Sequence, residues 1–220
     1  MKTDKVINGV LIKATQPEEG DTYEWPEGVT EIGEHAFSYW SSFNRPFSIP
    51  EGVTKIGEEA FSSWHNFNQS FTIPESVTEI GEYTFSYWYE FNQPFSIPEG
   101  VTKIGKGAFS DWHNFNRSFT IPKGVTEIGE QAFFSWYEFN QPFSIPEGVT
   151  EIGNNAFSYW NSFNRSNSRR TEATDKWLRI DNWVFADCYS GTLEQLRERL
   201  DSGESTPERE KAFEEISKPF

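Results

Sequence analysis

The sequence predicts a capped solenoid, in which a short β-strand and a short helical or 3₁₀ turn repeat along one axis. Three observations predict it. A period of 24 residues recurs six times from Trp25 to Ser168, the same positions of every copy are apolar, and the flanking segments depart from the period. Repeats of about 20–50 residues cannot bury their apolar side chains singly and stack instead. We therefore expect an N-terminal β-hairpin cap at 1–24, six repeats at 25–168 and a C-terminal α/β cap at 169–220.

The predicted core is aromatic. The 220 residues include 21 Phe and 9 Trp, and each aromatic side chain can bury roughly 150–250 Å². Leucine stands at Leu11, Leu178, Leu193, Leu196 and Leu200 and nowhere else. In the second copy the recurring apolar positions are Ile49, Val53, Ile56, Ala60, Phe61, Trp64, Phe67 and Phe71.

Within one copy, the pattern predicts two extended pieces and one turn. Phe71-Thr72-Ile73 alternates as a strand with one face inward, and Val53 to Ile56 forms a second extended piece. Gly57 follows, and we expect a positive φ there. Residues 58–64 have room for one helical or 3₁₀ turn.

The two ends carry different signals. Residues 6–12 are expected to form a hairpin around Asn8-Gly9. At the other end, 177–180 and 183–185 suggest two strands joined at Asp181-Asn182, followed by a helix from Leu193 to Leu200. Gly203 ends that helix, and Pro207 in the first helical position opens a second helix to about Ile216.

Stacking turns each repeat position into a row. The asparagine row is expected to bond the backbone of its own or the next turn; its members are Asn44, Asn68, Asn92, Asn116, Asn140 and Asn164. A second row alternates in sign along most of its length, which favours this register; it comprises Glu31, Lys55, Glu79, Lys103, Glu127 and Glu151.

The chain is strongly acidic, with 34 acidic and 19 basic residues and a net charge of −15. Direct binding of nucleic acid through its phosphates needs clustered cations and is not expected. Anionic lipid surfaces should also repel the chain. The negative charge indicates either a basic protein partner or, more simply, a surface that keeps the protein soluble.

Partner-binding residues are expected at positions that differ between copies, because core positions must repeat. Exposed tyrosine and arginine are frequent anchors of protein interfaces. The alternative is that these tyrosines pack between turns. The candidates are Tyr39, Tyr87, Tyr89, Tyr137, Tyr159, His65, His113, Glu90, Glu138, Arg45 and Arg117.

The sequence offers little for catalysis, and we expect no enzyme, no cofactor and no metal site. Cys188 is the single cysteine and has no internal partner for a disulfide. His65 and His113 fall on one row but two turns apart, roughly 10 Å, which is too far to share a metal. No phosphate loop, metalloprotease motif or nucleophile elbow occurs.

No apolar run reaches about 18 residues, so no membrane span is expected. Residues 1–20 lack the apolar stretch of a secretory signal. Read as given, the sequence predicts a cytoplasmic protein; a truncated N-terminus would allow a secreted or surface location.

The repeat pattern I-P-x-x-V-T-x-I-G-x-x-A-F-x-x-W-x-x-F resembles the BspA-type, or Treponema pallidum-type, leucine-rich repeat. In that family the Trp position is usually Cys and the Phe that follows it is usually Leu. The resemblance implies a right-handed solenoid with a β-sheet on one face and a role in protein or ligand binding. It does not imply catalysis. Many relatives are secreted or surface proteins and adhesins.

The function expected from the sequence is thus a non-enzymatic protein-interaction module. Its charge suggests an inhibitor or immunity-type protein that binds a basic partner, or a DNA-mimicking anti-defence protein. The alternatives are a bacterial surface adhesin or display fragment, and an array without a specific ligand. The oligomeric state is left open.

Overall fold

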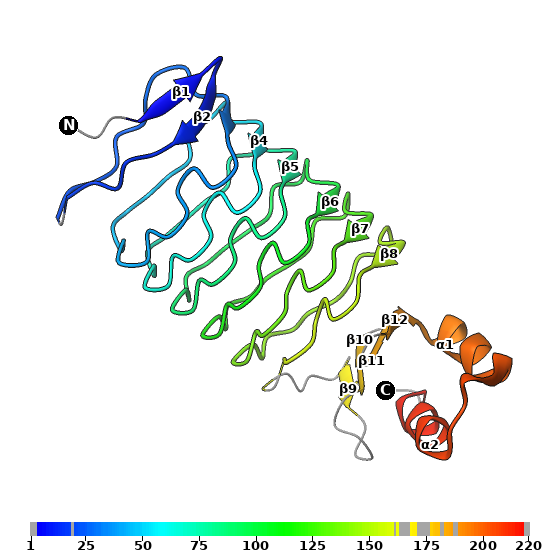
Figure 1. The fold of residues 1–220 in the computed structure, drawn as a ribbon. Coiled ribbons are helices and arrows are strands. Elements are labelled where there is room, and N and C mark those ends of the chain that lie inside the picture. Colours follow the sequence, from blue (N-terminus) through cyan, green and yellow to red (C-terminus); the bar gives the residue numbers. More distant parts are fainter. Residues whose placement is uncertain are drawn as a thin grey trace.

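The computed structural model describes residues 4–18, 20–160, 162, 168–170, 177–180, 183–186 and 189–217. It is a solenoid, with an eight-stranded sheet along one side of the stacked turns (Figure 1). The hairpin β1–β2 lies at one end of the stack, and the helices α1 and α2 lie beyond the other (Figure 1). The predicted fold class is confirmed.

The N-terminal hairpin pairs β1 (Lys5–Ile7) with β2 (Val10–Lys13) in antiparallel fashion. Asn8 and Gly9 between them have φ values of 51° and 80°, the left-handed pair that a tight type I′ turn requires. The hairpin expected at 6–12 is therefore present. Its second strand pairs in parallel with β3 and so joins the hairpin to the repeats.

Each repeat contributes one two-residue strand to the parallel sheet. These strands pair in register from turn to turn, with their isoleucines buried over each other. They are β3 (Glu31–Ile32), β4 (Lys55–Ile56), β5 (Glu79–Ile80), β6 (Lys103–Ile104), β7 (Glu127–Ile128) and β8 (Glu151–Ile152).

The charged neighbours of these isoleucines pair across the turns, as their alternating sign predicts. Lys55 Nζ lies 2.9 Å from Glu79 Oε2, and Lys103 Nζ lies 2.6 Å from Glu127 Oε2. Glu151 follows Glu127 without a change of sign.

The segment after the strand is a set of hydrogen-bonded turns rather than the expected helical or 3₁₀ turn. In the second copy, the N–H groups of Ala60 and Ser62 donate to carbonyls three residues back, whereas those at 59, 61 and 63 donate to the next turn. Glu59 and Ser63 have φ values of 50° and 64°. A helix cannot run through these left-handed residues.

The positive φ expected at Gly57 is wrong, because the left-handed residues lie two and six positions later. Glycine is needed at 57 for a different reason. A Cβ built there would lie 2.8 Å from Glu34 N and 2.9 Å from Gly33 C, both backbone atoms of the preceding turn. The glycine therefore allows the close approach of two turns.

The prediction that Phe71-Thr72-Ile73 forms a strand is also wrong, although the predicted inward and outward directions of its side chains are correct. Phe71 and Ile73 are buried and Thr72 is exposed, but the segment joins no sheet. Proline follows it at position 74, and prolines precede the equivalent segment in alternate copies. Since proline has no N–H to donate, it interrupts the backbone hydrogen bonds that a sheet would need on this side of the turn.

The C-terminal segment holds more strands than the two expected. The strands β10 (Trp177–Ile180) and β11 (Trp183–Ala186) are present, and β9 (Ser168–Arg170) and β12 (Tyr189–Thr192) extend them to a four-stranded antiparallel sheet. The turn Asp181-Asn182 and Cys188 lie outside the described residues. The flanking strands lack a strong apolar alternation, so the sequence pattern did not reveal them.

Two helices follow the sheet, close to the predicted bounds. α1 (Leu193–Arg199) leads into a kinked segment, η1 (Leu200–Glu204), in which Gly203 has a φ of 109°. α2 (Pro207–Ile216) begins at a cap where Thr206 accepts a hydrogen bond from Arg209 N. Leu196, Leu200, Ala212 and Ile216 form a small core between the helices.

Candidate interaction surface

The first part of the candidate surface is a row of residues whose backbone has the left-handed conformation. The backbone φ lies between 61° and 64° at Tyr39, Ser63, Tyr87, Asp111, Ser135 and Tyr159. A non-glycine residue in this region costs roughly 1–2 kcal/mol. Bonds between turns hold it there; Tyr39 N donates to Ser62 O at 2.9 Å and Tyr87 N to Ser110 O at 3.0 Å.

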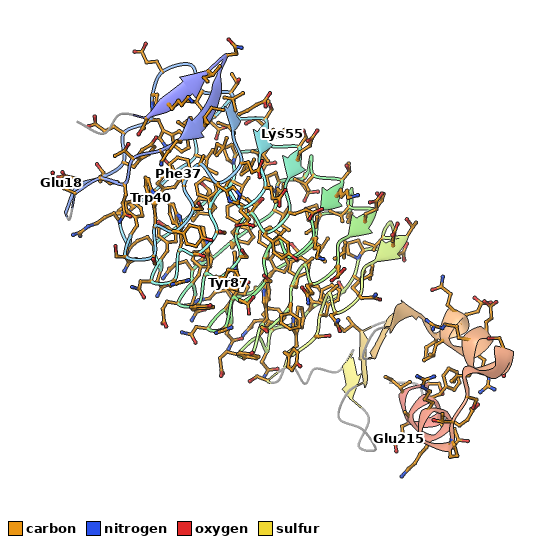
Figure 2. The ribbon with its side chains drawn as sticks, viewed as in Figure 1. Glu18, Phe37, Trp40, Lys55, Tyr87 and Glu215 are labelled. Carbon is orange, nitrogen blue, oxygen red and sulfur yellow. The ribbon has the colours of Figure 1, made fainter. Side chains whose placement is uncertain are left out.

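The side chains of this row differ in exposure, and that of Asp111 is intermediate. Ser63 and Ser135 are buried, whereas Tyr39, Tyr87 and Tyr159 are 70%, 40% and 58% exposed. Exposed tyrosines on an otherwise repetitive scaffold have no evident role in packing the core. Figure 2 shows Tyr87 apart from Lys55, which lies along the strands, so the Tyr87 ring does not occupy the sheet side.

Beside this row, histidine and tyrosine rings stack into a column that crosses four turns. His65 lies 4.8 Å from Tyr89 between ring centroids, Tyr89 lies 4.6 Å from His113, and His113 lies 4.6 Å from Tyr137. The first two pairs are inclined by 15° and 20°. The tyrosines of the column therefore pack between turns, and all four rings remain partly exposed.

Two of the three exposed tyrosines contact the column. Tyr87 meets Tyr89 edge-on at 6.1 Å, and Tyr159 meets Tyr137 in the same way at 6.5 Å. We call the two sets together the tyrosine–histidine surface, comprising Tyr39, Tyr87, Tyr159, His65, Tyr89, His113 and Tyr137.

Acidic groups lie beside this surface. Asp111 Oδ1 lies 3.4 Å from His113 Nε2. Partial burial raises the pKa of Tyr87 and of Tyr89, and the Asp111 carboxylate raises both further. Both phenols are therefore neutral at physiological pH and can donate as well as accept hydrogen bonds.

Two further carboxylates lie in the row after the column. Glu90 Oε2 accepts a hydrogen bond from Asn114 Nδ2 at 2.8 Å, and Glu138 is exposed. Their backbones are fixed, because Glu90 N donates to His65 O and Glu138 N donates to His113 O. The structure thus gathers nine of the eleven predicted residues on this one part of each turn.

The two arginines are placed differently. Arg117 Nε donates to Asn92 O at 2.9 Å, so it bonds the asparagine row. Arg45 lines a polar hollow of about 520 Å³ with the N-terminal residues Gln16, Glu18 and Asp21. Neither arginine joins the tyrosine–histidine surface through a described contact.

The asparagine row acts as expected for the described residues. The Oδ1 atoms of Asn44, Asn68, Asn92 and Asn116 each accept a hydrogen bond from the backbone N–H of the next asparagine, at 3.0–3.1 Å. Asn164 lies outside the described residues.

Sequence reasoning missed the role of Asp111. The signal was available, because Asp111-Trp112-His113 places a carboxylate two residues from an imidazole around a buried tryptophan. It also missed the left-handed backbone, which has no glycine to mark it except Gly107.

Within the residues that the structure describes, no three or more His, Cys, Asp and Glu side chains are grouped so as to hold a metal ion. Nor does any helix in the described part of the chain have the length and apolar character to span a membrane.

A family model described as the BspA type leucine-rich repeat region matches residues 20–140 and 87–193 in six copies. Among solved structures, a leucine-rich repeat protein from Bacteroides ovatus ATCC 8483 is 25% identical, with a TM-score of 0.49 over 61% of this chain and 40% of that one. A leucine-rich cell surface protein from Faecalibacterium prausnitzii A2-165 is 22% identical, with a TM-score of 0.51 over 84% and 59%.

The leucine-rich repeat protein of T. pallidum is 20% identical, with a TM-score of 0.49 over 70% of this chain and 78% of its own. No curated protein matches this chain. The chain spans 40% and 59% of the first two structures. The likeness to the Faecalibacterium prausnitzii protein, with a TM-score of 0.51, concerns the fold alone.

Proposed function

This chain belongs to the BspA-type leucine-rich repeat family, and on that basis we propose that it is a non-enzymatic protein-interaction module. Leucine-rich repeats in general mediate protein interactions. One observation carries the assignment to a face, namely the three exposed tyrosines on left-handed backbone beside the stacked column. The proposed site is the tyrosine–histidine surface with Glu90 and Glu138.

The geometry of this surface suits binding because it is already ordered. Stacking holds the column rings, and bonds between turns fix the backbone beneath the exposed tyrosines. A partner therefore has to immobilise few side chains, which lowers the entropy cost of association. Tyrosine combines a large apolar ring with a hydroxyl group and is frequent at interface hot spots.

The charge supports a narrower proposal, in which the partner is basic. The chain carries −15 in total, and Asp111, Glu90 and Glu138 lie on or beside the proposed surface. Opposite charges steer association and make it sensitive to salt. An inhibitor or immunity-type protein that covers a basic active site fits this chemistry, and so does a mimic of DNA. Direct contact with nucleic acid or membranes is not part of the proposal.

A surface adhesin or display fragment is the second candidate. The observation that favours it is the similar fold of a protein described as a cell surface protein. This weighs against the cytoplasmic location expected from residues 1–20. A secreted or surface location therefore stands beside the cytoplasmic one as a proposal.

A pull-down at two salt concentrations tests the function. The bait is the full chain, with Tyr39, Tyr87 and Tyr159 changed together to serine in a second bait. The matched control changes three exposed hydroxyl residues elsewhere on the coil, Thr72, Ser96 and Thr120, to alanine.

We expect the wild type and the control to retain one partner, and the tyrosine variant to lose affinity by roughly tenfold or more. Loss of a basic partner at high salt supports the inhibitor reading, and capture of matrix proteins or glycans supports the adhesin. Equal capture by all three baits would refute the assigned face. Capture of no partner by any bait would support an array without a specific ligand.

A further inference from the structure

Six tryptophans form a continuous stack along the axis of the solenoid, one from each repeat. Neighbouring indoles are 5.5–5.7 Å apart between centroids, and their planes are inclined by 5° to 12°. We call this stack the indole ladder; its members are Trp40, Trp64, Trp88, Trp112, Trp136 and Trp160. Such contact between near-parallel π-systems allows an electron to pass from one ring to the next.

The environment of the ladder matters as much as the spacing. From Trp64 to Trp160 the rings are fully buried, and each indole N–H donates to the backbone carbonyl of a phenylalanine in the preceding turn at 2.6–2.7 Å. An oxidised indole is a strong N–H acid. A carbonyl stabilises the cation through a charge-assisted hydrogen bond but is too weak a base to remove its proton.

An indole that keeps its proton remains a radical cation, which its neighbour can reduce. An electron hole in the ladder is therefore mobile. Loss of the proton would instead trap the hole as a neutral radical on one ring.

The N-terminal end of the ladder has the opposite chemistry. The ring of Tyr23 meets Trp40 edge-on, 5.4 Å away between centroids. The Tyr23 hydroxyl donates to Asp4 Oδ2 at 2.5 Å, while Asp4 Oδ1 accepts from Thr15 N at 2.6 Å. Burial and the Asp4 carboxylate raise the pKa of Tyr23 far above its ordinary value, so the phenol ionises only when it is oxidised.

We propose that the indole ladder carries an electron hole along the solenoid and that the Tyr23–Asp4 pair receives it. A one-electron oxidant of the radical class removes an electron from any ladder indole. The hole then moves by electron transfer between neighbouring indoles to Trp40.

Tyr23 gives one electron to the Trp40 cation and its hydroxyl proton to Asp4. Trp40 is thereby restored, and the products are a neutral phenoxyl radical and a protonated carboxyl group. No group of the core is consumed, and the oxidising equivalent leaves the buried stack for a half-buried phenol that a soluble reductant can approach. This activity goes beyond the proposed binding function and does not depend on it.

The test is laser flash photoionisation of the full chain in the presence of a soluble cobalt(III) ammine complex, which takes up the ejected electron irreversibly. Transient absorption follows the indole radical cation and the phenoxyl radical. In the wild type, we expect the phenoxyl signal to rise in step with the decay of the cation.

Three variants probe separate parts of the path. Tyr23→Phe should prolong the life of the cation and remove most of the phenoxyl yield. Asp4→Asn keeps the phenol but lacks the base, so phenoxyl formation should slow by roughly tenfold. Trp88→Phe interrupts the ladder and should lower the yield, because holes formed beyond it no longer reach Tyr23.

Phe91→Leu is the matched control, since it alters a buried ring beside Trp88 but outside the ladder, and should leave the yield unchanged. Near-ultraviolet circular dichroism verifies that each variant folds. Equal phenoxyl yields in the wild type and Tyr23→Phe, or decay of the wild-type cation to a neutral indole radical, would overturn the proposal. If Trp88→Phe does not fold, the two N-terminal variants decide it.

Discussion

At the scale of the residue, the unusual feature is how many ordinary side chains adopt the left-handed backbone conformation. Two positions of each repeat do so, and eleven of these twelve carry no glycine. In the first five repeats the conformation persists because the N–H groups of these residues donate to the next turn. The stack therefore supplies the energy for a backbone that a single repeat would not hold.

Glycine is required instead where two turns come closest. A Cβ at Gly105 would lie 2.7 Å from Gly81 O and 2.8 Å from Gly81 C, whereas a Cβ at Gly100 would meet Thr78 Cγ2 at 3.6 Å. We expect Gly105→Ala to lower the free energy of unfolding by roughly 1–3 kcal/mol, and Gly100→Ala to change it by under about 1 kcal/mol. Urea denaturation followed by circular dichroism measures both, and equal losses would show that the turns can move apart.

The asparagine row gives a second prediction. Asn68 Oδ1 accepts from Asn92 N and from Gln93 Nε2, both at 3.0 Å. Asn68→Ala should lower the free energy of unfolding by roughly 1–2 kcal/mol, because it removes the acceptor of the partly buried Asn92 N–H and leaves Gln93 Nε2 only its bond to Asn68 O. Asn68→Asp keeps the accepting oxygens and should lose less in the same urea titration. The opposite order would show that these bonds contribute little.

At the scale of the element, the sequence predicted what depends on periodic burial. The six strands, the hairpin at Asn8-Gly9 and the helix beginning at Pro207 each follow from a local signal. What it did not predict depends on contact between turns. Close approach at Gly57 and left-handed φ at Glu59 leave no trace in a single repeat, because the atoms involved belong to neighbouring copies.

The same division applies to the candidate surface. Variation between copies identified Tyr87, Tyr89 and His113, since core positions repeat and these do not. Variation did not separate surface rings from residues that bond the asparagine row, so Arg117 was included although it bonds Asn92. Nor did it show that the rings stack, because their separation depends on the spacing of the turns.

The two C-terminal helices yield a prediction about pH. Arg197 bonds Asp201 within one helical turn and reaches Glu210 on α2. The Ser205 hydroxyl and the Arg197 guanidinium lower the pKa of Glu210, and Arg197 lowers the pKa of Asp201. A carboxylate whose pKa is depressed in the folded state contributes stability above its unfolded pKa, and that contribution is lost as pH falls through the folded value.

Acidification below about pH 4 should therefore loosen the α1–α2 pair. Carboxyl chemical shifts measured by NMR during an acid titration test this. Glu210 should titrate below its usual range in the wild type and move toward that range in Arg197→Gln. An unchanged midpoint would show that the ion pair does not join the helices in solution.

At the scale of the whole molecule, two forces of different range act on the stack. Burial of aromatic side chains operates between neighbouring turns, so the array gains cohesion with each copy. Repulsion among the excess acidic groups acts over the entire chain, which carries −15. The exposed pairs Lys55–Glu79 and Lys103–Glu127 oppose this repulsion, but such pairs contribute under about 1 kcal/mol each.

Repulsion should therefore outweigh the ion pairs, and added salt should stabilise the fold. Screening at about 0.1 M salt shortens electrostatic interactions to roughly 10 Å, so we expect the melting temperature to rise by a few degrees between low and moderate salt. Glu151→Lys should reduce this rise, because it makes the net charge less negative and places a lysine opposite Glu127 in the register of the sheet.

Glu51→Lys changes the net charge equally at an exposed corner outside the strands, so it separates the general effect of charge from the new pair. Scanning calorimetry of the three proteins at both salt levels provides the measurement. The same salt should slow association with a basic partner, so stability and binding would change in opposite directions. A melting temperature that falls with salt would mean that local ion pairs, rather than overall charge, govern the electrostatics of this solenoid.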